Sequence, residues 1–296
     1  MANTQVIGFI GLGVMGEPIC RNIATKTGSK VIAFDLSEAP LQRLAADGVE
    51  VADDVASLVS AAGIVMLSLP GGPEVEAVIS GKDGIVKHSR AGQVIVDLST
   101  TPVELTRRLA ATLEEKEIRF ADAPVARTRQ AAIDGTLSIM VGGEADLFDE
   151  IRALLSAAAT EITHCGGVGC GQAVKVLNNM ILFQTVVALA EALAIGTQAG
   201  VDGKVLFETL SKGSADSFAL RNHGMKAMLP DAFPVGAFPT DYAIKDAGYA
   251  LALAKDMGIR ARGGQLAFEI LNETSAGGYG DQYWPLLSKI VRQDRD

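Results

Sequence analysis

Three polar side chains close together are the first candidates for chemistry in this sequence. Lys175, Asn178 and Asn179 stand at positions i, i+3 and i+4 of the segment GQAVKVLNNMILFQT. On a helix these positions share one face. A lysine amine can give or take a proton, and amide groups can orient a reacting oxygen. For this segment alone, an ordinary surface lysine is the favoured interpretation, so the assignment needs support from elsewhere in the chain.

The glycine-rich segment VIGFIGLGVMG near the N-terminus is a second candidate site. Gly11, Gly13 and Gly16 have G-x-G-x-x-G spacing directly after a predicted strand and at the start of a predicted helix. The first glycine permits a tight turn, the second lets a pyrophosphate approach the backbone, and the third allows close packing of helix and strand. We therefore expect a dinucleotide to bind here. The cofactor-binding segment is Gly11, Leu12, Gly13, Val14, Met15 and Gly16.

An acidic residue follows at the end of the second predicted strand, VIAFD. Asp35 stands nineteen residues after Gly16. A carboxylate there accepts hydrogen bonds from the ribose hydroxyls of NAD and repels the 2′-phosphate of NADP. We expect NAD, with NADP as the alternative because a nearby Lys or Arg could receive the phosphate. The competing interpretation is a glycine turn followed by an ordinary strand-end aspartate.

These residues need a scaffold, and the first half of the chain predicts one. Short β-branched runs alternate with amphipathic stretches, a pattern typical of a mainly parallel sheet with helices on both faces. The predicted strands are 5–10, 30–34, 64–69, 93–98, 119–121 and 137–141. The predicted helices are 18–27, 41–46, 74–79, 103–115 and 145–156. The strands at 64–69 and 93–98 end in MLSLPGGPEV and VDLSTTP, at the sheet edge where such folds bind ligands. Helix capping by Thr100 or Thr101 is the competing explanation for the second.

The pattern changes after the segment HCGGVGCGQ at 164–172. Helical periodicity takes over, in the ranges 174–197, 204–212, 242–257 and 264–275. We therefore predict a Rossmann-type α/β domain at 1–164 and an all-α domain at 165–296 for substrate binding and oligomerisation. An apolar helical domain indicates a homodimer or homotetramer.

Composition excludes several classes of partner. The formal net charge of −9 disfavours nucleic acid and anionic membranes. Three cysteines are too few for a disulfide framework, and the three histidines are scattered, so we expect a cytoplasmic protein without a metal site. The N-terminus shows no basic region or cleavage site. The apolar stretch Met180–Gly196 is interrupted by Gln184 and Glu191, which favours a buried helix over a membrane span.

Taken together, the motifs resemble those of the β-hydroxyacid dehydrogenase family, which includes 3-hydroxyisobutyrate dehydrogenase and tartronate semialdehyde reductase. Four segments carry the resemblance over nearly the whole chain: GFIGLGVMGEPICRN (8–22), DAPV with GTLSIMVGG (122–125 and 135–143), GQAVKVLNN (171–179) and YAIKDAGYAL (242–251). The resemblance implies that Lys175 is the catalytic acid/base and that Asn179, with Asn178 as a weaker candidate, orients the substrate. It also implies that Lys245 closes over the cofactor. The residues that match loops lining the nicotinamide are Leu69, Pro70 and Thr100.

The sequence departs from the family pattern in one segment. Most members have DAPVSGG, whereas this chain has DAPVARTRQAA, so Ala126, Arg127 and Thr128 replace Ser-Gly-Gly and Arg129 follows. A guanidinium suits a carboxylate or a tetrahedral oxyanion. The segment is similar to that of sulfolactaldehyde reductases, although Leu182 is apolar where a small polar residue would help to hold the anion. The competing interpretation leaves both arginines in solvent.

The sequence therefore predicts an NAD(P)-dependent dehydrogenase or reductase of a small anionic 3-hydroxy compound with a sulfonate or phosphonate head group. The alternative is a 3-hydroxyisobutyrate or tartronate semialdehyde reductase that acts on a carboxylate. A short-chain dehydrogenase would need Tyr-x-x-x-Lys, which none of the tyrosines provides. Decarboxylating 6-phosphogluconate dehydrogenases are much longer, and imine reductases usually lack the lysine at position 175. A non-catalytic NAD-sensing module would not require Lys175, Asn178 and Asn179 together.

Overall fold

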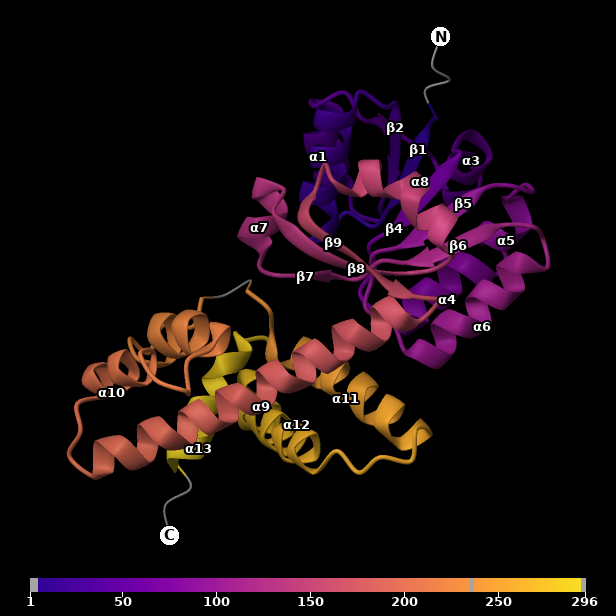
Figure 1. Ribbon diagram of the computed structural model, residues 1–296. Coiled ribbons are helices and arrows are strands. Elements are labelled where there is room, and N and C mark those ends of the chain that lie inside the picture. The colour runs from indigo at the N-terminus through magenta and orange to yellow at the C-terminus, as the bar shows by residue number, and fades with distance from the viewer. Residues whose placement is uncertain (1–4, 235–236, 294–296) are drawn as a thin grey trace. The chain divides into compact units, whose positions relative to one another are not determined.

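The computed structural model describes residues 5–234 and 237–293. The chain divides into two compact units, Met1–Lys175 and Val176–Asp296 (Figure 1). The first is an α/β unit built on one sheet and the second is helical, as the sequence predicts. The helix α9 (Cys170–Gln198) begins in the first unit and continues into the second.

The sheet of the first unit is mainly parallel. Its strands are β1 (Ile7–Ile10), β2 (Val31–Phe34), β3 (Glu50–Val51), β4 (Ile64–Leu67), β5 (Val94–Asp97), β6 (Arg119–Asp122), β7 (Val125–Ala126), β8 (Leu137–Gly142) and β9 (Ala159–Gly166). They lie in the order β3-β2-β1-β4-β5-β6-β8-β7, with β9 also paired to β8. The first six in that order are parallel, and β8 runs antiparallel to β6 and β7. The carboxyl ends of β1, β4, β5 and β6 therefore lie along one edge.

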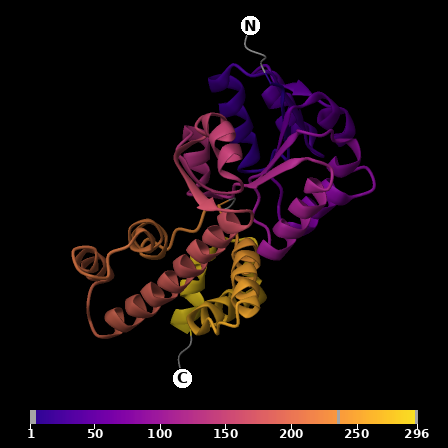
Figure 2. The same ribbon diagram turned by 45° about the vertical axis from the view of Figure 1, so that its right-hand side comes forward.

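Helices cover both faces of this sheet (Figures 1 and 2). They are α1 (Gly16–Thr27), α2 (Glu38–Ala45), α3 (Val55–Ala61), α4 (Gly72–Ser80), α5 (Ile85–His88), α6 (Val103–Glu114), α7 (Arg129–Asp134) and α8 (Ala145–Leu155). The central strands are buried on both sides because they are continuous apolar runs, such as IVML in β4. One core packs α1, α2 and α8 on the sheet, and the other packs α3 to α6.

The helical unit contains most of α9, followed by shorter helices. These are α10 (Gly203–Leu210), the π-helix η1 (Leu220–Met228), α11 (Thr240–Asp256), α12 (Arg262–Thr274), the π-turn η2 (Ser275–Tyr279), the 3₁₀ turn η3 (Trp284–Leu286) and α13 (Leu287–Gln293). Their core gathers Phe183, Phe207, Leu220, Leu271 and Trp284. Phe183 and Trp284 meet edge to face, with ring centroids 4.9 Å apart.

The long helix α9 is mainly apolar. By length and composition it could cross a membrane, and 33% of its most apolar stretch is buried inside the protein. One side packs into the helical core through Phe183, Val186 and Ala190. The opposite side exposes Ile181 and Ile195, so the expected buried helix is buried on one side only.

Candidate active site

The glycine-rich loop joins β1 to α1. Gly11 has φ +93°, in the left-handed region that favours glycine. A Cβ on Gly16 would lie 2.0 Å from the carbonyl oxygen of Gly11, so the helix can approach the strand this closely only at a glycine. Gly13 is exposed, and nothing lies within 4 Å of where its Cβ would be. The loop therefore fits a pyrophosphate that approaches its backbone at the start of α1.

Asp35 lies at the end of β2, beside this loop. One carboxylate oxygen accepts a hydrogen bond from the backbone N–H of Leu12 at 2.5 Å, and the other accepts from that of Ser37 at 2.7 Å. The carboxylate is thus held in a fixed orientation next to the glycine-rich loop. Arg43, the next cation along the chain, is paired with Glu17 at 2.7 Å. Its hydrogen bonds are the main cause that lowers the pKa of Glu17 to about 2, so this ion pair stays charged at neutral pH.

The loops after β4 and β5 are joined to each other. The Ser99 hydroxyl accepts a hydrogen bond from the backbone N–H of Leu69 at 2.9 Å. Asp97 accepts from the N–H of Ser99 at 2.9 Å and from the Thr101 hydroxyl at 3.4 Å. These bonds place the predicted positions Leu69 and Thr100 in loops whose backbones are tied together at the carboxyl edge of the sheet.

The first turn of α9 is attached to this edge. Asp122, at the end of β6, is fully buried and accepts hydrogen bonds from the N–H groups of Gly169 at 2.7 Å and Gln172 at 2.8 Å. The Gln172 amide accepts from the N–H of Thr101 at 3.1 Å and donates to the carbonyl of Ser99 at 2.8 Å. Lys175 is partly buried and follows three residues later on the same helix.

Burial shifts the pKa of the Asp122 carboxyl more strongly than its hydrogen bonds do. Desolvation raises its pKa to about 6, although the two backbone N–H groups favour the charged form, and the nearby Asp97 adds to the rise. A carboxyl that titrates near neutral pH therefore lies at the start of the helix that carries Lys175.

The helical unit holds the predicted amide and cofactor-closing residues. Asn179 is buried, and its amide donates to Asp246 at 2.7 Å while accepting from Asn178 at 3.1 Å. The Lys245 amine is 3.1 Å from the other Asp246 oxygen. The contact between the Lys245 amine and this oxygen is an ion pair, but its geometry is not that of a hydrogen bond. Asp246 in α11 thus orients Asn179 and attracts the lysine.

The atypical segment after β6 forms the short strand β7 and the start of α7. Ala126 lies in β7, and the Thr128 hydroxyl accepts from the N–H of Ala131 and caps α7. Arg127 is exposed with φ +86°, and its guanidinium donates to the carbonyl of Thr136 at 2.5 Å and to the Thr160 hydroxyl at 3.0 Å. Thr136 precedes β8, whereas Asp122 pairs with Gly142 at the other end of β8. Six residues of extended chain span about 20 Å, so the guanidinium is bonded at the end of β8 that lies away from Gly142.

Four buried polar residues of this site were missed in the sequence: Ser99, Asp122, Gln172 and Asp246. Asp122, next to Phe120, Ala121 and Ala123, is a polar residue in an apolar run, which was the available signal for it. The partners of these four residues, however, are as far as 73 residues away in the chain, and local spacing does not reveal such pairs.

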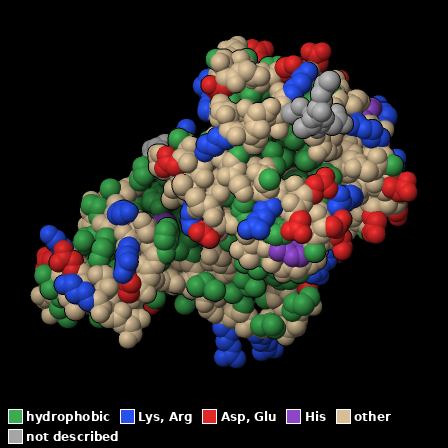
Figure 3. Space-filling model, turned by 45° about the horizontal axis from the view of Figure 1, so that its top comes forward, with side chains coloured by type: hydrophobic (Ala, Val, Ile, Leu, Met, Phe, Trp, Pro, Cys, Tyr) green, Lys and Arg blue, Asp and Glu red, His purple; other side chains and the backbone are tan. Residues whose placement is uncertain are grey.

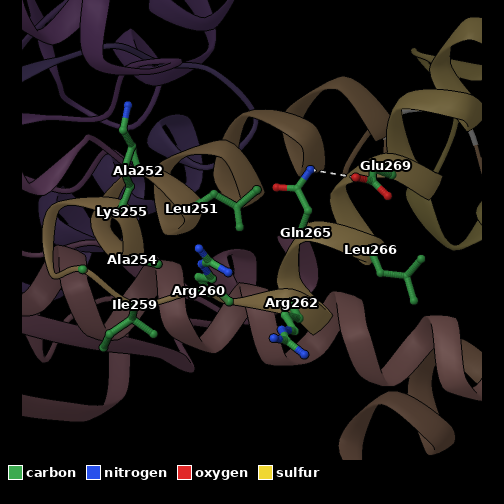
Figure 4. A pocket seen from close by; sticks show the side chains of 12 residues that line it. Leu251, Ala252, Ala254, Lys255, Ile259, Arg260, Arg262, Gln265, Leu266 and Glu269 are labelled. Carbon is green, nitrogen blue, oxygen red and sulfur yellow. Dashed lines mark hydrogen bonds between the residues drawn. The ribbon is translucent and has the colours of Figure 1, made fainter.

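Elsewhere in the described residues, we find no metal site that would compete with this candidate active site. Within 5–234 and 237–293, no group of three His, Cys, Asp or Glu side chains is arranged to hold a metal ion. The cysteines at 20, 165 and 170 are free. An open pocket of about 750 Å³ lies between the end of α11 and the start of α12, lined by Lys255, Arg260 and Arg262 among others (Figure 4). It contains none of the predicted site residues.

Known families and structures match this chain throughout. Residues 6–167 match the family described as the NAD binding domain of 6-phosphogluconate dehydrogenase. Residues 169–284 match the family described as NAD-binding of NADP-dependent 3-hydroxyisobutyrate dehydrogenase. The two matches fit the α/β unit with its glycine-rich loop and the helical unit that follows.

Relatives of similar length extend these matches. The chain is 35% identical to 2-(hydroxymethyl)glutarate dehydrogenase of Eubacterium barkeri over 99% of this chain and 97% of that protein. It is 31% identical to the NAD-dependent L-serine dehydrogenase of Pseudomonas aeruginosa, over 96% and 97%. The structure of Mycobacterium tuberculosis 3-hydroxyisobutyrate dehydrogenase with L-serine matches at a TM-score of 0.90 and 29% identity, over 98% and 99%. The chain therefore belongs to the β-hydroxyacid dehydrogenase family, that of 3-hydroxyisobutyrate dehydrogenase, and is an NAD(P)-dependent oxidoreductase that acts on CH–OH groups.

Proposed function

We propose that this enzyme oxidises a small 3-hydroxy carboxylate to the corresponding aldehyde, with NAD as its cofactor. The observation that carries the choice of a carboxylate is the position of Arg127, whose guanidinium is engaged at the start of β8 by Thr136 and Thr160. The full-length relatives named for hydroxymethylglutarate, serine and hydroxyisobutyrate support the same choice. Both arguments favour the carboxylate alternative over a sulfonate or phosphonate head group.

NAD is favoured over NADP by the surroundings of Asp35. Its carboxylate is held beside the glycine-rich loop, where it would meet the ribose hydroxyls of NAD and repel a 2′-phosphate. The cation that follows in sequence, Arg43, is already paired with Glu17.

The chemistry assigned to this chain is proton transfer and orientation. Bound NAD supplies the acceptor for the hydride that leaves the carbinol carbon. The Lys175 amine accepts the proton of the substrate hydroxyl as the carbonyl forms, and it returns that proton in the reverse direction. Asn179, oriented by Asp246, donates a hydrogen bond to the substrate. Proton transfer by a positioned group typically contributes about 10²–10⁴-fold to the rate.

A paired substrate screen tests this proposal. Initial rates are measured with NAD and with NADP on 3-hydroxyisobutyrate, L-serine, 2-(hydroxymethyl)glutarate, glycerate and threonate. Sulfolactate and a hydroxyalkylphosphonate provide head-group controls. We expect the highest kcat/KM with NAD and one of the carboxylates. A sulfonate or phosphonate that exceeds every carboxylate, or a preference for NADP, would contradict the proposal.

A further inference from the structure

We infer that Gln172 is a positioning residue for Lys175: it joins the first turn of α9 to the Ser99–Thr101 segment and so fixes the lysine amine relative to the loops after β4 and β5. This inference rests on the proposed role of Lys175 as the acid/base. Gln172 acts through Lys175 and is assigned no contact with substrate or cofactor.

The two bonds of Gln172 require an amide. The side chain is fully buried, and it meets a backbone N–H of Thr101 on one side and a backbone carbonyl of Ser99 on the other. Only a group with one acceptor and one donor satisfies both partners. A carboxylate would face the Ser99 carbonyl without a proton, and an apolar chain would leave both backbone groups unpaired in the interior.

Neighbouring bonds make this connection part of a continuous buried network. Ser99, which accepts from Leu69, extends it to the loop after β4. Asp122 holds the start of α9 through Gly169 and the N–H of Gln172 itself. A Cβ on Gly171 would lie 2.4 Å from the carbonyl oxygen of Met140, so the helix start is pressed against the sheet where it has no side chain. The first turn of α9 and both loops therefore behave as one body.

The step from Gln172 to Lys175 is short and stiff. The two residues are i and i+3 on one helix, which places them on the same face about 4.5 Å apart along the axis. A shift of the first turn relative to the loops would move the amine by a similar distance. A misplacement of about 1 Å can cost about 10²-fold in rate, because the proton and hydride donors must be aligned together.

A matched pair of buried glutamines separates positioning from stability. Gln93, 2% exposed, also bridges backbone groups in this unit: its amide donates to Val59 at 2.8 Å and to Ala62 at 2.9 Å. It precedes β5 and so lies at the opposite end of that strand from Ser99. We expect Gln172→Met and Gln93→Met to lower the unfolding midpoint in urea similarly. Only Gln172→Met should lower kcat, by about 10- to 100-fold, with the KM for NAD within about threefold of wild type.

Combining Gln172→Met with Lys175→Ala tests whether Gln172 acts through Lys175. The assay uses the best of the carboxylates 3-hydroxyisobutyrate, L-serine and 2-(hydroxymethyl)glutarate. In a Lys175→Ala background, Gln172→Met should lower kcat by no more than about threefold further, because the group it positions is absent. Gln172→Glu, which keeps the acceptor for Thr101, is compared in the same way if the methionine variant fails to fold.

Two outcomes would overturn the inference. One is equal kcat for the Gln172 and Gln93 variants, and the other is a full 10- to 100-fold loss in the Lys175→Ala background. A Lys175→Ala enzyme with nearly normal kcat would instead remove the proposed function on which the inference depends. The two failures are therefore distinguishable.

Discussion

At the scale of single residues, the groups assigned to chemistry depend on buried acidic partners. Asp246 holds the amide of Asn179, and Asp122 holds the helix start that precedes Lys175. Asp35 is itself fixed by two backbone N–H groups before any ligand is bound. Such preorganisation means that a bound substrate meets side chains already oriented, so less ordering is needed during the reaction.

Cofactor preference should depend on Asp35. Asp35→Ser removes the charge that repels a 2′-phosphate and the acceptor for the ribose hydroxyls. The ratio of kcat/KM for NAD to that for NADP should fall by the equivalent of roughly 1–3 kcal/mol. Measuring both cofactors on one variant cancels any loss of stability from the unpaired N–H groups of Leu12 and Ser37. An unchanged ratio would show that Asp35 does not select the cofactor.

Arg127 should not select the substrate head group. Arg127→Gly loses two hydrogen bonds but relieves the left-handed backbone at φ +86°. Each effect is about 1 kcal/mol, so the net change in the free energy of unfolding should be within about 1 kcal/mol. The ratio of kcat/KM for a carboxylate to that for its sulfonate analogue should be unchanged, as in Arg129→Ala. A tenfold change specific to Arg127→Gly would restore the sulfonate or phosphonate interpretation.

At the scale of elements, the start of α9 is where the sheet and the first helical turn meet. Asp122 caps this turn from the end of β6 while buried beside Asp97. Burial raises the pKa of this carboxyl, so its protonation is linked to folding.

The free energy of unfolding of the first unit should depend on the protonation of Asp122 in mildly acidic solution. Its folded pKa, about 6, lies above the ordinary value of 3.8, so the folded state binds the proton more tightly. The resulting stabilisation is fully present below about pH 3.8 and is lost as pH rises through about 6. It amounts to roughly 3 kcal/mol. When unfolding in urea is measured between pH 4 and pH 7, the wild-type protein should lose this stabilisation as the pH rises, and Asp122→Asn should not. An identical pH slope in both proteins would show that Asp122 does not titrate in this window.

Elements with a strong periodicity of apolar residues could be predicted from the sequence, and elements that form through tertiary pairing could not. The six predicted strands and the four predicted helices of the second half all form, with ends shifted by up to four residues. The strands β3 and β7 are two residues long and carry no period. β9 is largely exposed and forms because β8 offers a free edge, and the π-helix η1 has no sequence pattern of its own.

At the scale of the whole molecule, each unit has its own core, and the helical unit leaves apolar side chains exposed (Figure 3). A helix as apolar as α9 normally has most of its surface covered by other parts of a protein. Ile181 and Ile195, on its uncovered side, are 62% and 69% exposed. We propose that a second copy of the chain covers this side.

Charge on α9 should therefore disrupt an oligomer. The double variant Ile181→Lys/Ile195→Lys should lower the molar mass measured by light scattering during size exclusion. Val51→Lys is the control, because Val51 is also apolar and 50% exposed but lies in β3 of the first unit. A wild-type monomer, or an oligomer that survives the double variant, would contradict this prediction.

The motif residues of the candidate site can be proposed from the sequence because their spacing is local. The glycines at 11, 13 and 16 and the Lys175–Asn179 pair each lie within one turn or loop. The groups that hold them could not, because Asp246 is 67 residues from Asn179 and Ser99 is 73 from Gln172. The hydrogen bond from Arg127 to the carbonyl of Thr136 is likewise a contact that residue type and spacing do not reveal.

The turnover of Lys175→Ala at the pH optimum of the wild-type enzyme tests the assignment of Lys175 as the acid/base most directly. With NAD and the best carboxylate substrate, kcat should fall by at least about 100-fold, because the proton acceptor for the substrate hydroxyl is gone. The dissociation constant for NAD and the urea midpoint should stay close to wild type, and added methylamine should restore part of the rate. A variant that folds, binds NAD and retains nearly normal kcat would contradict the assignment of Lys175 as the acid/base.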